Sequence, residues 1–184
     1  TSFYGGSPLE IAHGSLLSYS SDRAEMYKVK ILPTSLDDEA LFKLPPHAFS
    51  YVVIVDAGSS GCRAHVYKYG KLGTYNGPLY ILPQHTSKKV KPGLSSFANN
   101  PQDAGASLID MITFVKEQIP EDDWKTTPIW LKATAGLRML DASVSEQILN
   151  SVRSVLKDQS PFIFKGANVI SGNEEGGFGW IAFN

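Results

Sequence analysis

The sequence predicts an α/β fold in which strands come first and helices then alternate with strands. An apolar run at residues 51–55 ends in a glycine-rich turn, and a stretch of alternating polarity follows it. Two later segments, 104–119 and 144–156, carry apolar residues at helical spacing. A short apolar strand pattern at 128–134 lies between these two segments. This order predicts a sheet with helices packed against it.

Composition is that of one soluble globular domain: of 184 residues, 42% are hydrophobic and 19% are charged. The net charge of −1 gives no reason to expect nucleic acid or an anionic membrane as a partner. Cys62 is the only cysteine, which excludes an intrachain disulfide. No run of about 18 apolar residues is present, so we expect no membrane contact from this segment. The chain begins at Thr1 without a signal pattern, so targeting segments could have been cut away.

The amino-terminal part is expected to be an extension or linker, and the rest a folded lobe. Residues 1–50 lack sustained periodicity, whereas residues 51–184 carry clear patterns. The first predicted strand is 51–56, the second is 63–69 and the third is 79–85. The lysines that follow, Lys88-Lys89-x-Lys91, are expected to lie in a solvated loop.

Helix signals dominate the second half of the chain. Asn100 before Pro101 is a capping residue followed by proline at the first helical position, and the apolar spacing then continues to Ile119. Ser143 and Glu146 have the spacing of a capping box for the next helix.

The last predicted elements are a strand at 167–170 and a helix that starts near Glu174 and Glu175. The complete order is β-β-β-α-β-α-β-α, which predicts a mixed sheet. Among α/β layouts, this is the order of a ribonuclease H-like, or actin-like, lobe.

A glycine-rich turn, Asp56-Ala57-Gly58-Ser59-Ser60-Gly61, follows the first strand. Backbone N–H groups and two hydroxyls at such a turn can bind phosphate, and the carboxylate can hold a divalent cation through water. Taken alone, the same sequence is also typical of an ordinary polar turn.

Two later junctions carry complementary chemistry. Thr134, Gly136 and Arg138 offer a hydroxyl, a tight turn and a guanidinium suited to phosphate oxygens, although a solvated arginine beginning a helix would look the same. Glu174 and Glu175 could orient and deprotonate water, or could simply stabilise a helix amino terminus. Because ligands gather at strand ends in open α/β sheets, the three junctions could share one cleft.

Together and in this order, the three motifs resemble those of the apyrase, or nucleoside triphosphate diphosphohydrolase, family, which includes GDPases and UDPases. The matching segments are 56–61, 133–138 and 171–180, and Lys91-Pro92-Gly93-Leu94 is also similar. The resemblance covers about residues 51–184 and implies the amino-terminal lobe of a two-lobed, actin-like enzyme. Its implied reaction is metal-dependent hydrolysis of the terminal phosphate of nucleoside tri- or diphosphates by direct attack of water.

The resemblance also implies roles for individual residues. The phosphate-binding residues would be Gly58, Ser59, Ser60, Gly61, Arg63, Thr134 and Gly136. Asp56 and Thr134 would hold Ca²⁺ or Mg²⁺ through water. Glu175, rather than Glu174, would be the general base because the family acid stands next to the glycine that follows. Arg138 would neutralise phosphate charge during catalysis.

A two-lobed enzyme of this kind needs a second phosphate loop, and the sequence shows none. Asp103-Ala104-Gly105-Ala106-Ser107 is similar in composition, but no apolar strand precedes it and Ala104 lies on the apolar side of the predicted helix. We therefore expect a partial lobe whose partners are a nucleoside di- or triphosphate and a second lobe of the same protein. The isolated chain is expected to be inactive. The resemblance further implies the secretory pathway, namely the Golgi or ER lumen, the cell surface or secretion.

Two alternatives to this enzyme remain open. A sugar kinase or chaperone-type ATPase would also use Asp-x-Gly turns, but it would not explain the segments at 134–138 and 174–176. A non-catalytic fragment that binds nucleotide or a partner would explain all the motifs without turnover. For Cys62, the sequence favours a small buried site over a nucleophilic role.

Overall fold

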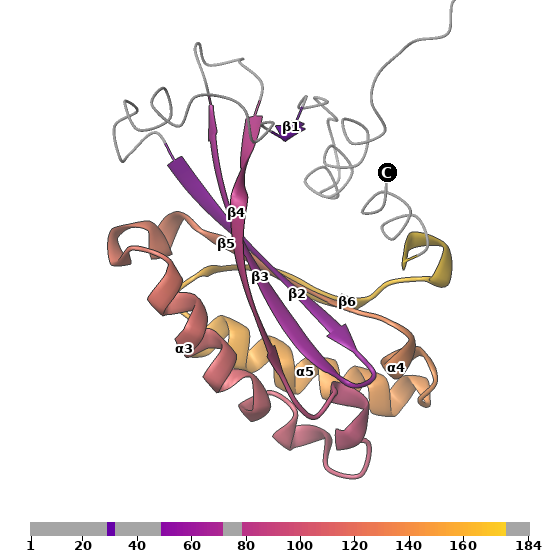
Figure 1. The fold of residues 1–184 in the computed structure, drawn as a ribbon. Helices are drawn as coiled ribbons and strands as arrows, with labels where there is room; N and C mark the ends of the chain where they lie inside the picture. Colours follow the sequence, from indigo (N-terminus) through magenta and orange to yellow (C-terminus); the bar gives the residue numbers. More distant parts are fainter. Residues whose placement is uncertain (1–28, 32–48, 72–78, 176–184) are drawn as a thin grey trace, which may run out of the picture. The chain divides into compact units, whose positions relative to one another are not determined.

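The computed structural model describes residues 29–31, 49–71 and 79–175. Within these ranges, six strands form a sheet with the order β1-β4-β3-β2-β5-β6 (Figure 1). The chain divides into two compact units. The first, here called the core unit, comprises residues 50–67 and 85–172. The second comprises residues 1–49, 68–84 and 173–184.

Three consecutive strands are neighbours in the sheet. They are β2 (Phe49–Gly58), β3 (Gly61–Lys71) and β4 (Leu79–Val90). Only Ser59 and Ser60 separate β2 from β3, and such a short connection makes the pair an antiparallel hairpin. The three-residue strand β1 (Val29–Ile31), which the sequence did not predict, pairs in parallel with β4.

Two further strands extend the sheet in parallel beyond β2. They are β5 (Pro128–Ala133) and β6 (Ile163–Val169), with Ala57 opposite Ala133 and Ala133 opposite Val169. The carboxyl ends of β2, β5 and β6 therefore reach the same edge of the sheet. A three-strand meander followed by two parallel strands on its far side is the predicted ribonuclease H-like order, which confirms the α/β fold class.

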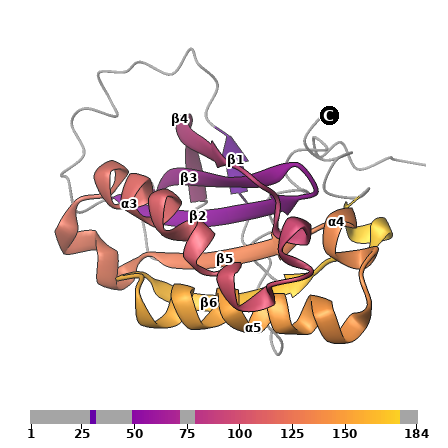
Figure 2. The same cartoon turned by 90° about the horizontal axis from the view of Figure 1, so that it is seen from below.

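Helices cover one face of this sheet in the core unit. The two long ones, α3 (Ile109–Gln118) and α5 (Ala142–Asp158), lie on the same face (Figures 1 and 2). A single turn, α4 (Ala135–Arg138), follows β5 directly. The 3₁₀ turns are η2 (Leu94–Phe97), η3 (Pro101–Asp103), η4 (Ala106–Leu108) and η5 (Glu121–Thr126).

The core forms where the sheet meets these helices. In β5 every second residue is buried, as expected for a strand with one face against helices. The largest fully buried side chains belong to Leu94, Leu108, Met111, Ile129, Leu131, Leu137, Ile148 and Leu156. They come from η2, η4, α3, β5, α4 and α5, so one apolar cluster fixes the loops that carry the functional motifs.

Strand predictions were correct in place but short in length. β4 continues to Val90, so Lys88 and Lys89 lie in a strand and the loop predicted for them is wrong. The sixth strand begins at Ile163 rather than residue 167. In β4, exposed polar residues hide the strand pattern, while in β6 Lys165 and Gly166 interrupt it; pairing with the neighbouring strand extends both.

Both helix starts differ from the prediction. The segment after Asn100 forms 3₁₀ turns before α3 begins at Ile109, because Gly105 N donates a hydrogen bond to Ser151 Oγ at 3.0 Å and is thereby tied to α5. The predicted capping box is also wrong. Helix α5 begins after Asp141, and Glu146 forms an ion pair with Arg153 instead of closing the box.

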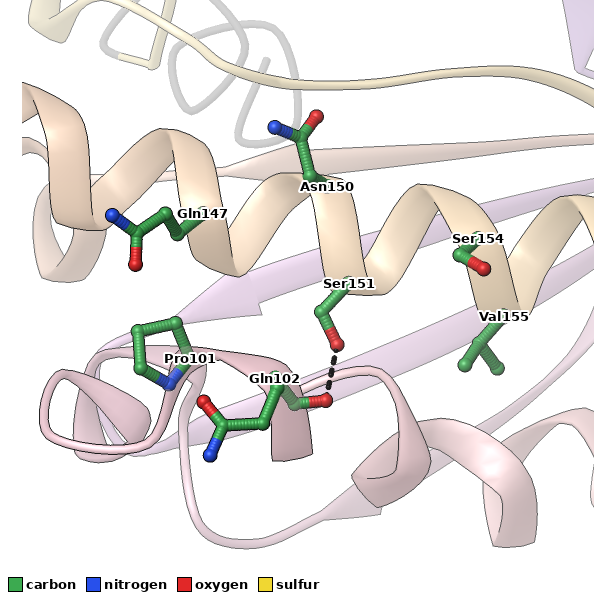
Figure 3. Close-up of a pocket in the computed structure, with 7 residues that line it drawn as sticks. All are labelled: Pro101, Gln102, Gln147, Asn150, Ser151, Ser154 and Val155. Carbon is green, nitrogen blue, oxygen red and sulfur yellow. Dashed lines mark hydrogen bonds between the residues drawn. The ribbon is translucent and has the colours of Figure 1, made fainter.

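Ser151 holds η3 and η4 against α5 with a single hydroxyl. Its Oγ accepts from Gly105 N at 3.0 Å and donates to the Gln102 carbonyl at 2.7 Å (Figure 3). Because Ser151→Ala would leave both backbone groups without this partner, we expect it to lower the free energy of unfolding by about 1–2 kcal/mol in urea titrations. Ser154→Ala is the matched control. That hydroxyl donates to the exposed carboxylate of Asp158, so a loss above about 0.5 kcal/mol there would contradict the assignment.

Candidate functional site

The candidate site is the turn between β2 and β3, here called the phosphate turn (residues 56–61). Ser59 and Ser60 are exposed at its tip, Asp56 is exposed at its start and Gly61 is buried at its end. The turn therefore presents two hydroxyls and a carboxylate to solvent on a rigid hairpin.

Two glycines from other segments press against Ser59. A Cβ placed on Gly93 would lie 2.3 Å from the Ser59 carbonyl oxygen and 2.6 Å from the Gly58 carbonyl oxygen. A Cβ placed on Gly136 would lie 2.9 Å from Ser59 Cα. Real Cβ atoms do not approach backbone so closely, so only glycine allows these contacts. The Lys91-to-Leu94 segment and the second motif thus converge on the phosphate turn, as the sequence predicted for the second motif.

Thr134 is bound to the strand that carries the phosphate turn. Its backbone N–H donates to the Ala57 carbonyl at 3.2 Å, and its hydroxyl donates to the same oxygen at 3.5 Å. The pairing of Ala57 with Ala133 brings Thr134 and Asp56 to the ends of adjacent parallel strands. The two residues predicted to hold a cation through water therefore lie at one edge.

Arg138 is exposed at the end of α4 and is tied to the chain after β6. Its Nη1 donates to the Ile170 carbonyl at 2.7 Å, while Ile170 N donates to the Ala133 carbonyl at 2.8 Å. The first bond orients the guanidinium of Arg138. Together the two bonds connect the second motif to the segment that leads into the third motif. Arg63, the other predicted phosphate ligand with a positive charge, is exposed on β3.

Glu174 and Glu175 are half-buried in a helical stretch at residues 172–175. They belong to the second unit, whereas the phosphate turn belongs to the core unit. The predicted helix start is confirmed. The role of Glu175 as a base stays a prediction, and residues 176–180 of the third motif lie outside the described residues.

Lys89 is a neighbour of the phosphate turn that the sequence did not predict. Its Nζ donates to Ser60 Oγ at 2.9 Å. The predicted strands 63–69 and 79–85 have equal lengths and gave no signal for this contact. Only the observed 11 residues of β3 require a partner strand that extends beyond His85.

Cys62 is fully buried behind the turn, as predicted. Burial, with a smaller contribution from the Asp56 charge, raises the pKa of its thiol to about 12, although a hydrogen bond from the Leu94 backbone opposes this. The thiol is therefore protonated at neutral pH and is not a nucleophile.

Direct metal ligation finds no support in the part of the chain that the structure describes. No group of three or more His, Cys, Asp or Glu side chains there could hold a metal ion. A cation bound through water to one carboxylate and one hydroxyl needs no such group, so Asp56 and Thr134 fit that mode.

A separate groove lies between η3 and α5 (Figure 3). Its volume is ≈ 450 Å³, and it is lined by Pro101, Gln102, Gln147, Asn150, Ser151, Ser154 and Val155. It shares no residue with the phosphate turn and has no cationic lining residue, so it is unsuited to a phosphate.

Comparison with known proteins decides the family. The model of the GDA1/CD39 (nucleoside phosphatase) family matches residues 43–184. The chain belongs to this family. The resemblance read from its three motifs is thereby confirmed, and the family match begins slightly before the predicted lobe boundary at residue 51.

Curated relatives of this GDA1/CD39 chain are similar over most of its length. A nucleoside-triphosphatase of Pisum sativum is 39% identical over 157 residues, covering 81% of this chain and 33% of the relative. A guanosine-diphosphatase of Schizosaccharomyces pombe is 40% identical over 136 residues, covering 73% of this chain and 24% of the relative. Ectonucleoside triphosphate diphosphohydrolase 3 of Mus musculus is 42% identical over 144 residues, covering 77% of this chain and 27% of the relative. The chain thus spans between a quarter and a third of these relatives' lengths.

Among solved structures, nucleoside triphosphate hydrolases from Neospora caninum match with a TM-score of 0.49 and 18% identity, over 70% of this GDA1/CD39 chain and 30% of that one. Within the described residues, no helix is long and apolar enough to cross a membrane.

Proposed function

We propose that this chain is the phosphate-binding part of an enzyme that hydrolyses the terminal phosphate of nucleoside tri- or diphosphates. The proposal rests on one observation: two glycines from separate segments pack on Ser59 and hold the phosphate turn in one conformation. A preorganised turn is what phosphoryl transfer requires, because positioning and charge stabilisation supply most of its catalysis. Names of the relatives, such as nucleoside-triphosphatase and guanosine-diphosphatase, support the same substrate class.

In this proposal the phosphate turn binds the terminal phosphate. The backbone N–H groups at Gly58 and Gly61 would donate to the anion, and the exposed hydroxyls of Ser59 and Ser60 would donate to phosphate oxygens. Arg138 adds positive charge from the neighbouring motif, and its bond to the Ile170 carbonyl keeps the guanidinium oriented. Thr134, Gly136 and Arg63 complete the predicted phosphate-binding set.

Asp56 and Thr134 would hold a divalent cation, Ca²⁺ or Mg²⁺, through water. Both side chains lie at the ends of adjacent parallel strands beside the turn. A cation bound there would supply neutralisation of the negative charge on the phosphate oxygens. Asp56, exposed and anionic, would otherwise repel the substrate.

Glu175 is the proposed general base. It would accept a proton from a water molecule as the water oxygen bonds to the terminal phosphorus. The bond from phosphorus to the bridging oxygen then breaks, and the shortened nucleotide leaves with that oxygen. No covalent enzyme intermediate is needed.

A matched pair of variants tests this function. In a protein that joins this chain to a complementary second lobe, Glu175→Gln should lower kcat for phosphate release from GDP, UDP or ATP at least about a hundredfold, because the amide cannot accept the proton. Glu174→Gln removes the same charge one residue earlier and should leave kcat within about threefold. The isolated chain serves as the blank.

Circular dichroism should show both variants folded. Near-normal turnover by Glu175→Gln would overturn the assignment. Nucleotide binding without any turnover by the unmodified protein would instead favour a non-catalytic binding role.

The proposal also includes a second lobe and a cellular location. A second phosphate loop from another lobe would close the site over the phosphate, as the resemblance to two-lobed enzymes implies. The prefix "ecto" in the name of mouse relatives supports a site on the secretory route or outside the cell.

A further inference from the structure

Strand β4 ends beside the phosphate turn and brings a lysine to it. Lys89 Nζ donates to Ser60 Oγ at 2.9 Å. The approach of this strand depends on Gly61, where a Cβ would lie 2.5 Å from the Val90 carbonyl oxygen and 2.8 Å from Lys89 Cε. Gly61 therefore lets both the backbone of β4 and the stem of Lys89 lie directly against the turn.

The direction of this hydrogen bond determines what Ser60 can do. An ammonium group only donates, so the Ser60 oxygen must accept from Lys89. The hydroxyl proton of Ser60 then points away from Lys89 and is available to an acceptor in front of the turn. Since Ser60 is exposed, that acceptor can be an oxygen of a bound phosphate.

Charge acts in the same direction. Asp56 stands at the start of the turn and its negative charge is felt as far as Cys62, whose pKa it helps to raise. The positive charge that Lys89 brings to Ser60 offsets this repulsion for an incoming polyphosphate.

We propose that Lys89 is a positioning residue for the terminal phosphate: it orients the Ser60 hydroxyl as a donor and adds positive charge at the turn. This rests on the proposed function, since it assigns a further residue to the same site. Neither the three motifs nor the resemblance to apyrases includes Lys89.

Lys88 provides a matched control one residue away. It carries the same charge on the same strand, but its Nζ lies 5.5 Å from the centroid of the Phe114 ring on α3. Lys89→Met and Lys88→Met therefore change the net charge equally, but only Lys89→Met removes the contact with Ser60, whereas Lys88→Met removes the contact with Phe114.

The test measures kcat/KM for GDP, UDP and ATP in the protein that joins this chain to a second lobe. Lys89→Met should lower kcat/KM about tenfold to a hundredfold, the range for a lost hydrogen bond to a charged group. Lys88→Met should stay within about twofold. Lys89→Arg, which keeps the donor and the charge, should recover most of the loss, a recovery that a purely structural defect would not show.

A double-mutant cycle tests the route through Ser60. If Lys89 acts by orienting that hydroxyl, Lys89→Met should cost far less in a Ser60→Ala background than in the unmodified protein. The slope of log kcat/KM against log salt concentration should also become shallower in Lys89→Met than in Lys88→Met.

Equal losses in Lys88→Met and Lys89→Met, or fully additive losses with Ser60→Ala, would overturn the proposal for Lys89 alone. Turnover that survives Glu175→Gln would instead overturn the proposed function. The two failures are therefore distinguishable. If Lys89→Met proves unfolded, Lys89→Leu, which also removes the donor and the charge, replaces it in both the comparison with Lys88→Met and the cycle with Ser60→Ala.

Discussion

Gly93→Ala is expected to destabilise the core unit by at least about 3 kcal/mol and to abolish phosphate binding at the turn. The added Cβ would stand 2.3 Å from the Ser59 carbonyl oxygen and 2.6 Å from that of Gly58. Both obstacles are backbone atoms within a hairpin, so no side-chain rotation relieves the clash. Either the η2 segment moves off the turn and opens the core around Leu94, or the turn itself changes shape.

Two other glycines calibrate this effect. Gly136→Ala meets the backbone Cα of Ser59 at 2.9 Å, a clash less severe than that at Gly93, so we expect a smaller loss of about 1–2 kcal/mol. Gly172→Ala meets nothing within 4 Å and should change the free energy of unfolding by less than about 0.5 kcal/mol. Urea unfolding followed by circular dichroism measures all three. A Gly93→Ala chain as stable as Gly172→Ala would show that the η2 segment does not pack on the phosphate turn.

These glycines show what the sequence can and cannot predict about the site. The phosphate turn and the second motif were recognisable because each combines glycine with polar donors at the end of an apolar strand. For Gly93, the sequence shows only that its segment is similar to one of the apyrase family. Its neighbours in the sequence do not distinguish a glycine in an ordinary loop from one packed against a carbonyl 34 residues away. The contact is tertiary, and only coordinates reveal it.

The fold was predictable to a similar depth. The central strand β2 buries most of its apolar residues, and β5 has a buried residue at every second position. Both strands lie where the sequence predicted them. Where a local sequence pattern and a contact with a distant residue favour different structures, the distant contact determines the structure. Arg153 bonds the Ala167 carbonyl and pairs with Glu146, so that glutamate is unavailable to the predicted cap. Lys89 follows the same rule, because pairing with β3 carries it out of the expected loop and onto Ser60.

Alkaline unfolding that depends on Cys62 is the second large expected effect. Burial raises the pKa of this thiol from its ordinary value near 9 to about 12 in the folded chain. The folded state therefore favours the protonated thiol, and its contribution to stability is fully present below about pH 9. Above that value the unfolded chain releases the proton first, so stability falls by about 1.4 kcal/mol per pH unit. The loss reaches about 4 kcal/mol by pH 12.

Between pH 9 and 10, the loss of stability that Cys62 causes can be measured separately from the loss that the tyrosines cause. Burial also raises the pKa values of Tyr51 and Tyr67 above their ordinary 10.0, so their contributions to the loss begin only near pH 10. Cys62→Ala should therefore be less stable than the unmodified chain at pH 7 but should lose about 1 kcal/mol less between pH 9 and 10. Equal pH slopes for the two chains in that window would contradict a buried, protonated thiol. Because Asp56 contributes to the raised pKa, Asp56→Asn should lower the folded-state pKa of the thiol slightly. The loss of stability should then begin at the same pH but level off sooner and be smaller in total, which would connect the buried thiol to the charge at the phosphate turn.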